Sequence, residues 1–405
     1  MVSCESGDRM FSAISPESSG VLFSNSIDED KKVSILDYLY YYNGAGVGSG
    51  DLNNDGLNDL FFVSNTGENK LFINEGNLKF KDETKKAGIY SISSWNTGVS
   101  LIDINSDGWL DIYVSSVVGI NGFIGHNELW LNNQDGTFSE KSKLYGLDLK
   151  YYGVSASFFD YDKDGDLDVY IVNHGLHPEN NYERQRNLAL TDELLSSNDR
   201  LLRNDNNVYT DVTLESGLVY GNIGYGLDSV IADFNHDGWD DIYVSNDFYE
   251  DDYYYINQGN GKFIESLSDY FTHTSQFSMG LDFADLNGDS YPELFSLDML
   301  PEDEKVLKTS LDDSSPQTLR RRRFLGYTDQ FSRNHLHLNY QGESFRDIAH
   351  FSNVEASDWS WSCLFSDLDN DGLKDLQITN GILKRPNDAD FVKYISSEEI
   401  RNTLN

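Results

Sequence analysis

The sequence predicts an all-β fold, a β-propeller built from four-stranded blades. Three observations lead to this prediction. A nine-residue acidic loop occurs six times, short apolar segments of strand length recur in the same order around each loop, and aromatic residues are frequent while proline is rare. With 25 Tyr, 23 Phe and 6 Pro, the 405-residue chain has the composition of a folded β protein and not of a disordered acidic one.

The chain before the first loop is predicted to be a tail followed by short strands. Residues 1–10 are polar and form the tail. Residues 11–15 and 20–27 have the apolar pattern of short strands, and residues 34–42 lead into the first repeat. Because a repeated unit can build one large domain, residues 11–380 are predicted to form a single propeller.

The acidic loop carries oxygen-bearing side chains at positions 1, 3, 5 and 9, and a glycine follows position 5 in five of six copies. Ca2+ takes about six to eight oxygen ligands, so alternate side chains and the position-7 carbonyl suit it. The glycine permits the positive φ that curls the chain around an ion. A string of Asx-turns is the alternative, because Asp-Gly and Asn-Asp pairs favour those turns as well. Sixfold repetition favours the metal interpretation.

Each loop therefore offers four side chains and one carbonyl to a Ca2+ ion, up to six ions in all. Two loops have four carboxylates and the others three, which makes twenty acids. The predicted ligands are Asp51, Asn53, Asp55, Leu57 and Asp59; Asp103, Asn105, Asp107, Trp109 and Asp111; Asp160, Asp162, Asp164, Asp166 and Asp168; Asp233, Asn235, Asp237, Trp239 and Asp241; Asp285, Asn287, Asp289, Tyr291 and Glu293; Asp367, Asp369, Asp371, Leu373 and Asp375.

Four predicted strands surround each loop. A strand of small residues precedes the loop, where the crowded axis of a propeller excludes large side chains, and an apolar strand follows it. A third strand ends in a turn rich in Asn and Gly, and an aromatic residue leads the fourth. The first strands start at Gly44, Gly98, Gly153, Gly226 and Met279, the third at Leu71, Leu129, Leu201, Tyr254 and Leu336, and the fourth at Phe80, Phe138, Tyr209, Phe263 and Phe345.

The last copy, from Trp359, supplies only two strands and ends near Asn380. Residues 381–405 form a tail in which Ser396 and the following residues read as a capping box opening a short helix to Leu404. Five full units and one partial unit predict an open ring. A compact six-bladed ring closed by residues 11–27 is the alternative. Insertions near residues 174–199 and 298–333 are predicted to lie on one face, where function concentrates.

The charge balance excludes one class of partner. The chain has 30 Lys plus Arg against 68 Asp plus Glu, a formal net charge of −38. Affinity for nucleic acid depends on neutralising phosphates, so no nucleic-acid partner is predicted.

Two cysteines are too few for a disulfide framework. Cys363 lies in an apolar run and is predicted to be a buried thiol. Cys4 resembles the acylated cysteine at the end of a bacterial lipoprotein signal, although the hydrophobic region of such a signal is missing; an ordinary cysteine is the alternative. No run is long enough to span a bilayer, so a lipid on Cys4 is the only membrane attachment considered.

Several stretches resemble a known family. The acidic loops, the LFINEG strand from Leu71 and the DVT…SGL segment at 211–218 resemble FG-GAP/VCBS repeats of integrin α-subunits and cartilage acidic protein. The segments SLDMLPEDEKVLK, from Ser296, and DWSWSCLFSDLDNDGLKDLQITNGILKRPND, from Asp358, resemble large bacterial cell-envelope VCBS proteins. The resemblance covers residues 11–395. It implies a seven-bladed propeller, Ca2+ in the blade loops, export to the periplasm, outer membrane or cell surface, and often a lipid anchor.

Two features depart from that family. The ASPIC/UnbV-type C-terminal domain of many relatives and a seventh repeat are not in this sequence. Ser290 and Glu293 replace the usual Gly and Asp of the loop, so the fifth site is expected to be the weakest.

Two functions follow as hypotheses. The favoured one is a calcium-stabilised binding or scaffold module of the bacterial cell envelope, with a protein or polysaccharide ligand. The alternative is an enzyme that acts on polysaccharide through its channel or face loops. Its candidate residues are His174, His177 and Glu179 in the first insertion and Asp247, Glu250, Asp251 and Asp252 after the fourth loop. For these residues, a polar insertion and an acidic turn are the ordinary interpretations. No HExxH motif, phosphate-binding glycine loop or Ser-His-Asp order is present.

One basic run, residues 320–323, lies in the second insertion. An acid-paired or solvated run is the ordinary interpretation. The more specific interpretation is a docking point for an acidic partner or an anionic polysaccharide.

Overall fold

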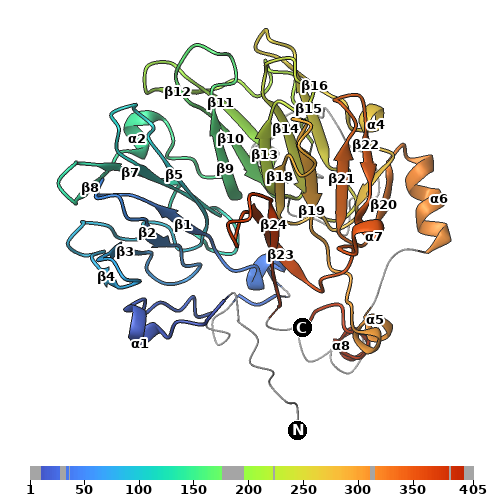
Figure 1. Cartoon of the computed structure of the whole chain (residues 1–405), viewed down its shortest axis with the longest axis horizontal. Helices are drawn as coiled ribbons and strands as arrows, with labels where there is room; N and C mark the ends of the chain where they lie inside the picture. The colour runs from blue at the N-terminus through green and yellow to red at the C-terminus, as the bar shows by residue number, and fades with distance from the viewer. Residues whose placement is uncertain are drawn as a thin grey trace.

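The computed structural model describes residues 11–27, 33–35, 37–175, 196–221, 224–310, 315–382 and 385–395. It contains five four-stranded antiparallel sheets and one two-stranded antiparallel sheet that follow one another around a common axis (Figure 1). The fold is therefore a β-propeller, as predicted. Among the described residues, no helix is long and apolar enough to cross a membrane.

Each blade follows the predicted order of inner, second, third and outer strand. The blades comprise β1 (Val47–Gly50), β2 (Asp59–Phe62), β3 (Lys70–Asn74) and β4 (Phe80–Asp82); β5 (Asn96–Ile102), β6 (Asp111–Ser116), β7 (Glu128–Asn132) and β8 (Phe138–Glu140); β9 (Gly153–Phe159), β10 (Asp168–Asn173), β11 (Arg200–Asn204) and β12 (Tyr209–Asp211); β13 (Gly226–Ala232), β14 (Asp241–Asn246), β15 (Tyr253–Asn257) and β16 (Phe263–Glu265); β18 (Leu281–Ala284), β19 (Glu293–Ser296), β21 (His335–Asn339) and β22 (Phe345–Asp347); and the partial pair β23 (Ser360–Ser366) and β24 (Asp375–Asn380).

Inner strands of successive blades contact one another around the axis, from β1 through β5, β9, β13 and β18 to β23. The small residues in these strands are required by this packing. A Cβ atom at Gly98 would collide with the carbonyl oxygen of Val154, and one at Gly280 with the carbonyl oxygen of Trp361. The predicted crowding at the axis is confirmed.

The hydrophobic core lies between neighbouring sheets. Tyr209, at the start of β12, packs with Tyr113 and Val169 in a cluster shared by the second and third blades. Phe345, at the start of β22, stacks on Phe271 with ring centroids 4.3 Å apart. The aromatic residue that opens the fourth strand is thus part of the hydrophobic core in the second to fifth blades.

Short helices and one extra pair of strands decorate the propeller. The second insertion contributes α5, α6 and β20, and β20 pairs in parallel with β17 beside the fifth blade. These elements are α1 (Pro16–Ser19), η1 (Leu39–Tyr42), α2 (Ser142–Tyr145), α4 (Leu267–Tyr270), β17 (His273–Ser275), α5 (Glu304–Thr309), α6 (Pro316–Phe324), β20 (Asp329–Phe331), α7 (Ala349–Ser352) and α8 (Ala389–Ile395).

The N-terminal strands predicted at residues 11–15 and 20–27 are wrong, because no strand is assigned there. Residues 16–19 form α1 instead, since Ser15 caps the helix by accepting the N–H of Ser18 and Pro16 occupies the first turn. The segment then follows the first blade, where the Asn25 side chain donates to Asn65 Oδ1 at 2.7 Å.

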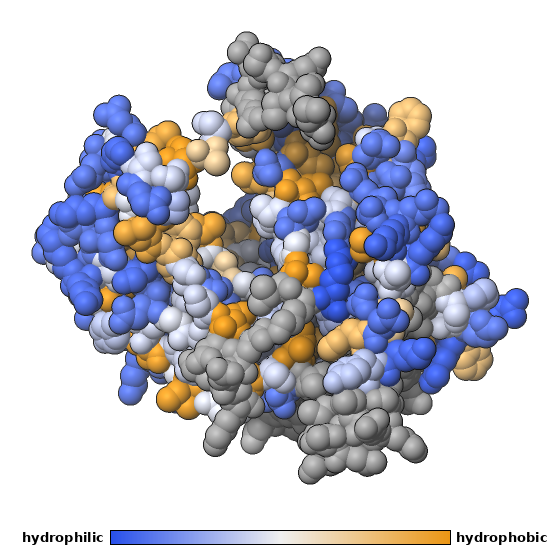
Figure 2. All heavy atoms as spheres, turned by 90° about the horizontal axis from the view of Figure 1, so that it is seen from below, coloured by the Kyte–Doolittle hydropathy of each residue, from blue (hydrophilic) through white to orange (hydrophobic). Residues whose placement is uncertain are grey.

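The predicted count of five full units and a two-strand sixth unit is confirmed. Within the described ranges, β24 pairs only with β23, and residues 11–27 bind the first blade and not β24. The alternative six-bladed ring closed by those residues is therefore not formed. Seen from below, the molecule is hollowed, and hydrophobic residues gather around the hollow (Figure 2).

Several predictions fall outside the described residues. They concern the tail with Cys4, most of the first insertion, and the helix at residues 396–404. Cys363 is a buried free thiol in β23, as predicted.

Candidate metal centres

The first aspartate organises every acidic loop. Both oxygens of the Asp51 carboxylate accept backbone N–H groups, Oδ1 from Asp55 at 3.0 Å and Oδ2 from Gly56 at 2.8 Å. The same pair of hydrogen bonds recurs in the other five loops at 2.8–3.2 Å. Position 5 then accepts the N–H of position 7, so the backbone curls around its own carboxylates.

The glycine after position 5 has the conformation that the sequence predicts. Gly56 has φ 86° and Gly165 has φ 98°, both in the left-handed region. Ser290 occupies the same place in the fifth loop with φ 76° and therefore adopts a glycine-like conformation at a steric cost.

The carboxylate at position 9 is buried in the first five loops and connects the loop to its blade. Asp59 Oδ2 accepts the N–H of Leu52 at 3.0 Å, and its Oδ1 accepts the N–H of Asn74 at the end of β3, at 2.8 Å. The second and third loops repeat this bridge, and in the fourth loop Asp241 accepts the N–H of Asn257 and the Tyr254 hydroxyl. In the fifth loop Glu293 is longer, and it also accepts from the Asn287 side-chain amide at 3.0 Å.

Carboxylates converge in the two loops that carry four of them. Asp160, Asp162 and Asp168 each place one oxygen within 4.8 Å of the others, and Asp367, Asp369 and Asp371 do the same. In the third loop, Asp162 Oδ1 is buried and has no hydrogen-bond partner among the described residues. A buried acceptor that lacks a donor fits a bound cation. The donor set therefore suits a hard cation.

Burial and like charges disfavour full ionisation of the metal-free loops. Burial, together with the other loop carboxylates, raises the pKa of Asp111, Asp168 and Asp241 to about 7. Burial and then the neighbouring Asp164 and Asp160 carboxylates raise the pKa of Asp162. A compensating cation would remove this conflict.

Side chains at position 4 connect three pairs of neighbouring loops. The Asn54 side-chain amide donates to the Gly108 carbonyl oxygen of the next loop at 3.0 Å. Lys163 donates to the Gly238 carbonyl oxygen, and His236 Nε2 lies 2.6 Å from the carbonyl oxygen of Ser290. Each of these contacts joins position 4 of one loop to position 6 of the next.

The residues considered for an enzyme do not form one site. His174 is buried, with Nε2 2.9 Å from the Tyr38 hydroxyl. Asp251 accepts the N–H of Thr328, and Asp252 accepts the N–H of Asn246. These contacts hold segments of the fold together.

Glu250 is also buried, whereas His177 and Glu179 lie outside the described residues. The basic run at 320–323 forms the end of α6, where Arg323 pairs with Asp329 at 2.5 Å. The acid-paired interpretation is thus confirmed for Arg323.

Asp247 has a different setting, because it lines a cavity of about 260 Å³ at one end of the propeller axis. Its Oδ2 accepts the Tyr40 hydroxyl at 3.3 Å, and burial raises its pKa to about 8. Trp359 and Trp361 also line the cavity, and the Trp359 indole N–H is buried without an acceptor among the described residues. Sequence reasoning missed this cavity because its walls come from many distant segments between Ile35 and Asn387, although the Trp-Ser-Trp pattern marks one of them.

A second cavity of about 270 Å³ follows the axis. All six inner strands or their leading residues contribute to it, together with Tyr38, Tyr40 and His174. It is the axial channel of the propeller.

Comparisons with known proteins agree with the repeat structure. A profile of the FG-GAP-like repeat matches residues 51–114, 117–171 and 233–296. The chain is 26% identical over 212 residues to cartilage acidic protein 1 of Mus musculus and 28% identical over 137 residues to that of Xenopus tropicalis. These matches cover 51% and 33% of this chain but only 29% and 20% of the relatives.

Solved structures with related shapes are distant. An Agrocybe aegerita lectin, described as recognising non-reducing terminal N-acetylglucosamine, has a TM-score of 0.39 and 13% identity, covering 82% of this chain and 70% of the lectin. The Photorhabdus luminescens Tc holotoxin pore has a TM-score of 0.35 and 15% identity, covering 82% of this chain and 13% of that one.

Proposed function

Because this chain belongs to the FG-GAP repeat family, we propose that it is a calcium-stabilised propeller that serves as a binding or scaffold module of the bacterial cell envelope. The observation that carries the proposal is the loop geometry: backbone N–H groups fix the first carboxylate in all six loops, and in two loops three carboxylates converge within 4.8 Å of one another. Calcium is the proposed cation because all the donors are oxygens, and because Ca2+ tolerates variable geometry in which a bidentate carboxylate or water completes the coordination.

The ions would be held by the side chains at loop positions 1, 3, 5 and 9 and by the position-7 carbonyl. Their chemical contribution is charge compensation, which stabilises the folded state that binds them. Export and an envelope location are supported by the resemblance of the sequence to envelope proteins and by the higher calcium level outside the cytoplasm.

Calcium binding can be tested by titration calorimetry on the full chain. Asp162→Asn removes one carboxylate from the third loop and is expected to weaken one class of sites by about tenfold. Asp269→Asn, an exposed acid of α4 outside the loops, is the control and should leave the isotherm unchanged. Equal isotherms for all three proteins would contradict the proposal.

The ligand is proposed to be a glycan end bound in the Asp247 cavity. A concave, mainly apolar site with a few convergent polar groups is the usual form of a small-ligand site. About 260 Å³ suits one sugar residue better than a protein surface. The Asp247 carboxyl and the Trp359 indole N–H provide an acceptor and a donor for sugar hydroxyls, and the Trp361 ring provides an apolar face.

A glycan array probed with the calcium-loaded chain tests this assignment. Trp359→Phe keeps an aromatic side chain but replaces the indole by a phenyl ring without the N–H, and it is expected to weaken any glycan hit by about tenfold, the order of one polar contact. Tyr90→Phe, which removes a hydroxyl from an exposed aromatic side chain outside the acidic loops and the cavity, is the control. Glycan binding that stays unchanged in Trp359→Phe would show that the ligand binds to another surface. Binding to a protein but to no glycan would remove the glycan from the proposal.

A further inference from the structure

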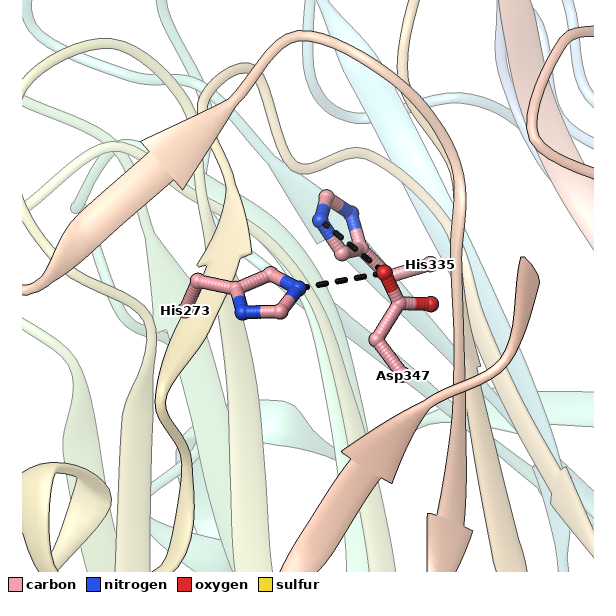
Figure 3. Close-up of side chains that lie close together, drawn as sticks. All are labelled: His273, His335 and Asp347. Atoms are coloured by element: carbon pink, nitrogen blue, oxygen red, sulfur yellow. Dashed lines mark hydrogen bonds and ion pairs between the residues drawn. The ribbon is translucent and has the colours of Figure 1, made fainter. Parts of the chain in front are cut away.

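A cluster of histidines beside the fifth blade lies apart from the acidic loops. Figure 3 shows His273 from β17, His335 from β21 and Asp347 from β22 pointing toward one another. His273 Nε2 is 3.1 Å from Asp347 Oδ2, and His335 Nε2 is 3.9 Å from the same oxygen. His335 and Asp347 are nearly inaccessible, while the His273 side chain is 23% exposed, so one approach from solvent remains.

Comparison with the other blades shows why the histidine cluster of the fifth blade is unusual. The acid at the end of each fourth strand caps the turn that follows, as Asp82 does for the N–H of Thr84 and Asp347 for the N–H of Ala349. In two blades a basic side chain from the start of the third strand pairs with this acid: Lys70 with Asp82, and Arg200 with Asp211, each at 3.4 Å. His335 occupies the corresponding place in the fifth blade.

His335 cannot play the role of that basic side chain. Its Nε2 lies 3.9 Å from Asp347 Oδ2, which is beyond hydrogen-bond distance. None of the four ring nitrogens of His335 and His337 has a hydrogen-bond partner among the described residues. A buried polar atom left without a partner costs roughly 1–3 kcal/mol, so such an arrangement calls for a ligand.

We propose that His273, His335 and Asp347 form a binding site for a borderline transition-metal ion, with Zn2+ as its reference ligand, separate from the calcium loops. Imidazole nitrogens select Zn2+ over Ca2+ and Mg2+, which prefer oxygen. Two His and one carboxylate are a common donor set for zinc with an open fourth position. Ligand atoms of a tetrahedral zinc site lie about 3.3 Å apart, and the two N···O distances bracket this value.

The surroundings orient these ligands. Thr272 Oγ1 lies 2.9 Å from His273 Nδ1, which leaves Nε2 directed at Asp347. His337 stacks on His335 with an interplanar angle of 13° and a centroid separation of 5.4 Å, which fixes the ring plane. Such supporting contacts determine which nitrogen binds the metal. Binding replaces the proton that His273 Nε2 shares with Asp347 Oδ2, and that proton leaves to solvent.

The Arg333 guanidinium would compete with a metal ion for the Asp347 carboxylate. Its Nη2 lies 2.5 Å from Asp347 Oδ2 and 3.5 Å from His273 Nε2, so its positive charge occupies the edge of the site. Zn2+ entry requires the guanidinium to withdraw from Asp347. The site therefore predicts an unusual result: removing Arg333 strengthens metal binding, whereas a purely structural ion pair would only lose stability.

The experiment is a Zn2+ titration of the full chain by calorimetry with the loops held saturated by excess Ca2+, together with the visible absorption of bound Co2+ as a report of nitrogen ligation. One Zn2+ per chain is expected. His273→Gln should weaken binding at least about tenfold and remove the Co2+ band, and Arg333→Gln should tighten binding. His350→Gln, an exposed imidazole in the same blade, is the control.

His273→Gln is the main variant because the side chain is partly exposed, and a melting curve in Ca2+ shows whether each variant is folded. Asp347→Asn provides an independent loss-of-ligand test. No stoichiometric Zn2+ binding by the folded wild-type chain would overturn the proposal. So would equal affinities for His273→Gln and His350→Gln, or weaker binding by folded Arg333→Gln.

Discussion

At the scale of single residues, one or two backbone angles and a few buried carboxyls decide how each loop and cavity behaves. Ser290 has φ 76° where the other loops have glycine, so its conformation opposes the intrinsic preference of serine. Asp247 is buried in the cavity at the axis, where burial raises its pKa to about 8. We therefore make one stability prediction for each of these two residues.

Ser290→Gly is expected to stabilise the calcium-loaded chain by about 1 kcal/mol, because glycine adopts a positive φ at no steric cost. Gly238→Ser makes the reverse change in the fourth loop, where φ is 89°, and should destabilise by a similar amount. Chemical denaturation at saturating Ca2+ measures both. If the two variants shift the unfolding midpoint in the same direction, the positive φ does not explain the difference in stability.

Stability should also depend on pH through Asp247. Its folded pKa, about 8, is raised above the unfolded value of about 4, so the folded state binds the proton more tightly. The contribution is fully present below about pH 4 and is lost as the pH rises toward 8, with a slope of at most about 1.4 kcal/mol per pH unit.

Asp247→Asn keeps an acceptor for the Phe248 N–H but cannot ionise, so it is expected to flatten this fall. Urea denaturation at several pH values in excess Ca2+ provides the test. A variant as pH-sensitive as the wild type would show that other groups, such as Asp298 with its own raised pKa, cause the effect.

At the scale of elements, the acidic loops should differ in affinity. The loops from Asp160 and Asp367 have four carboxylates and are expected to bind Ca2+ most tightly. The loop from Asp285 should be weakest, because Ser290 is strained and Glu293 reaches back to Asn287. Anomalous scattering from a calcium-soaked crystal would rank the occupancies. Full occupancy at Asp285 beside a vacant Asp160 loop would reverse the ranking.

The strands of the blades could be predicted from the sequence because their signals are local and repeated. Each fourth strand starts at the predicted aromatic residue, for example Phe80 and Phe345. The failures have physical reasons as well. The Ser15–Pro16 cap turns a predicted strand region into α1, and the second insertion forms helices that no repeat specifies.

Some functional features can likewise be predicted from the sequence, and others cannot. Loop positions can be read from spacing alone, since Asp51 and its equivalents accept the same N–H groups in every copy. The histidine cluster cannot, because β17 reaches the fifth blade only by pairing with β20, which lies more than fifty residues later in the chain. Long-range contacts of this kind leave no period in the sequence.

At the scale of the whole molecule, two features have opposite effects on association between chains. A formal net charge of −38 keeps chains apart, whereas β24 presents an outer edge that no described strand covers. Unpaired strand edges promote association between chains. Calcium binding lowers the negative charge, so we expect self-association to increase with Ca2+.

Gln377→Lys, on the exposed part of β24, should reduce that association, because charged edge residues discourage strand pairing. Sedimentation velocity of both proteins at saturating Ca2+ measures the effect. Gln317→Lys, at an exposed position of α6 away from the edge, makes the same change in net charge and is the control. A wild-type chain that stays monomeric at every concentration would show that the β24 edge is not adhesive.

The central claim is that calcium holds this propeller together, since twenty loop acids repel one another unless a cation joins them. The most direct measurement is thermal unfolding of the full chain in EGTA, in excess Ca2+ and in excess Mg2+. Each site at a hundredfold excess over its Kd contributes about 2.7 kcal/mol, so Ca2+ should raise the midpoint strongly. Mg2+ should do so poorly, because it requires a smaller octahedral site. An identical midpoint in EGTA and in Ca2+ would contradict the account.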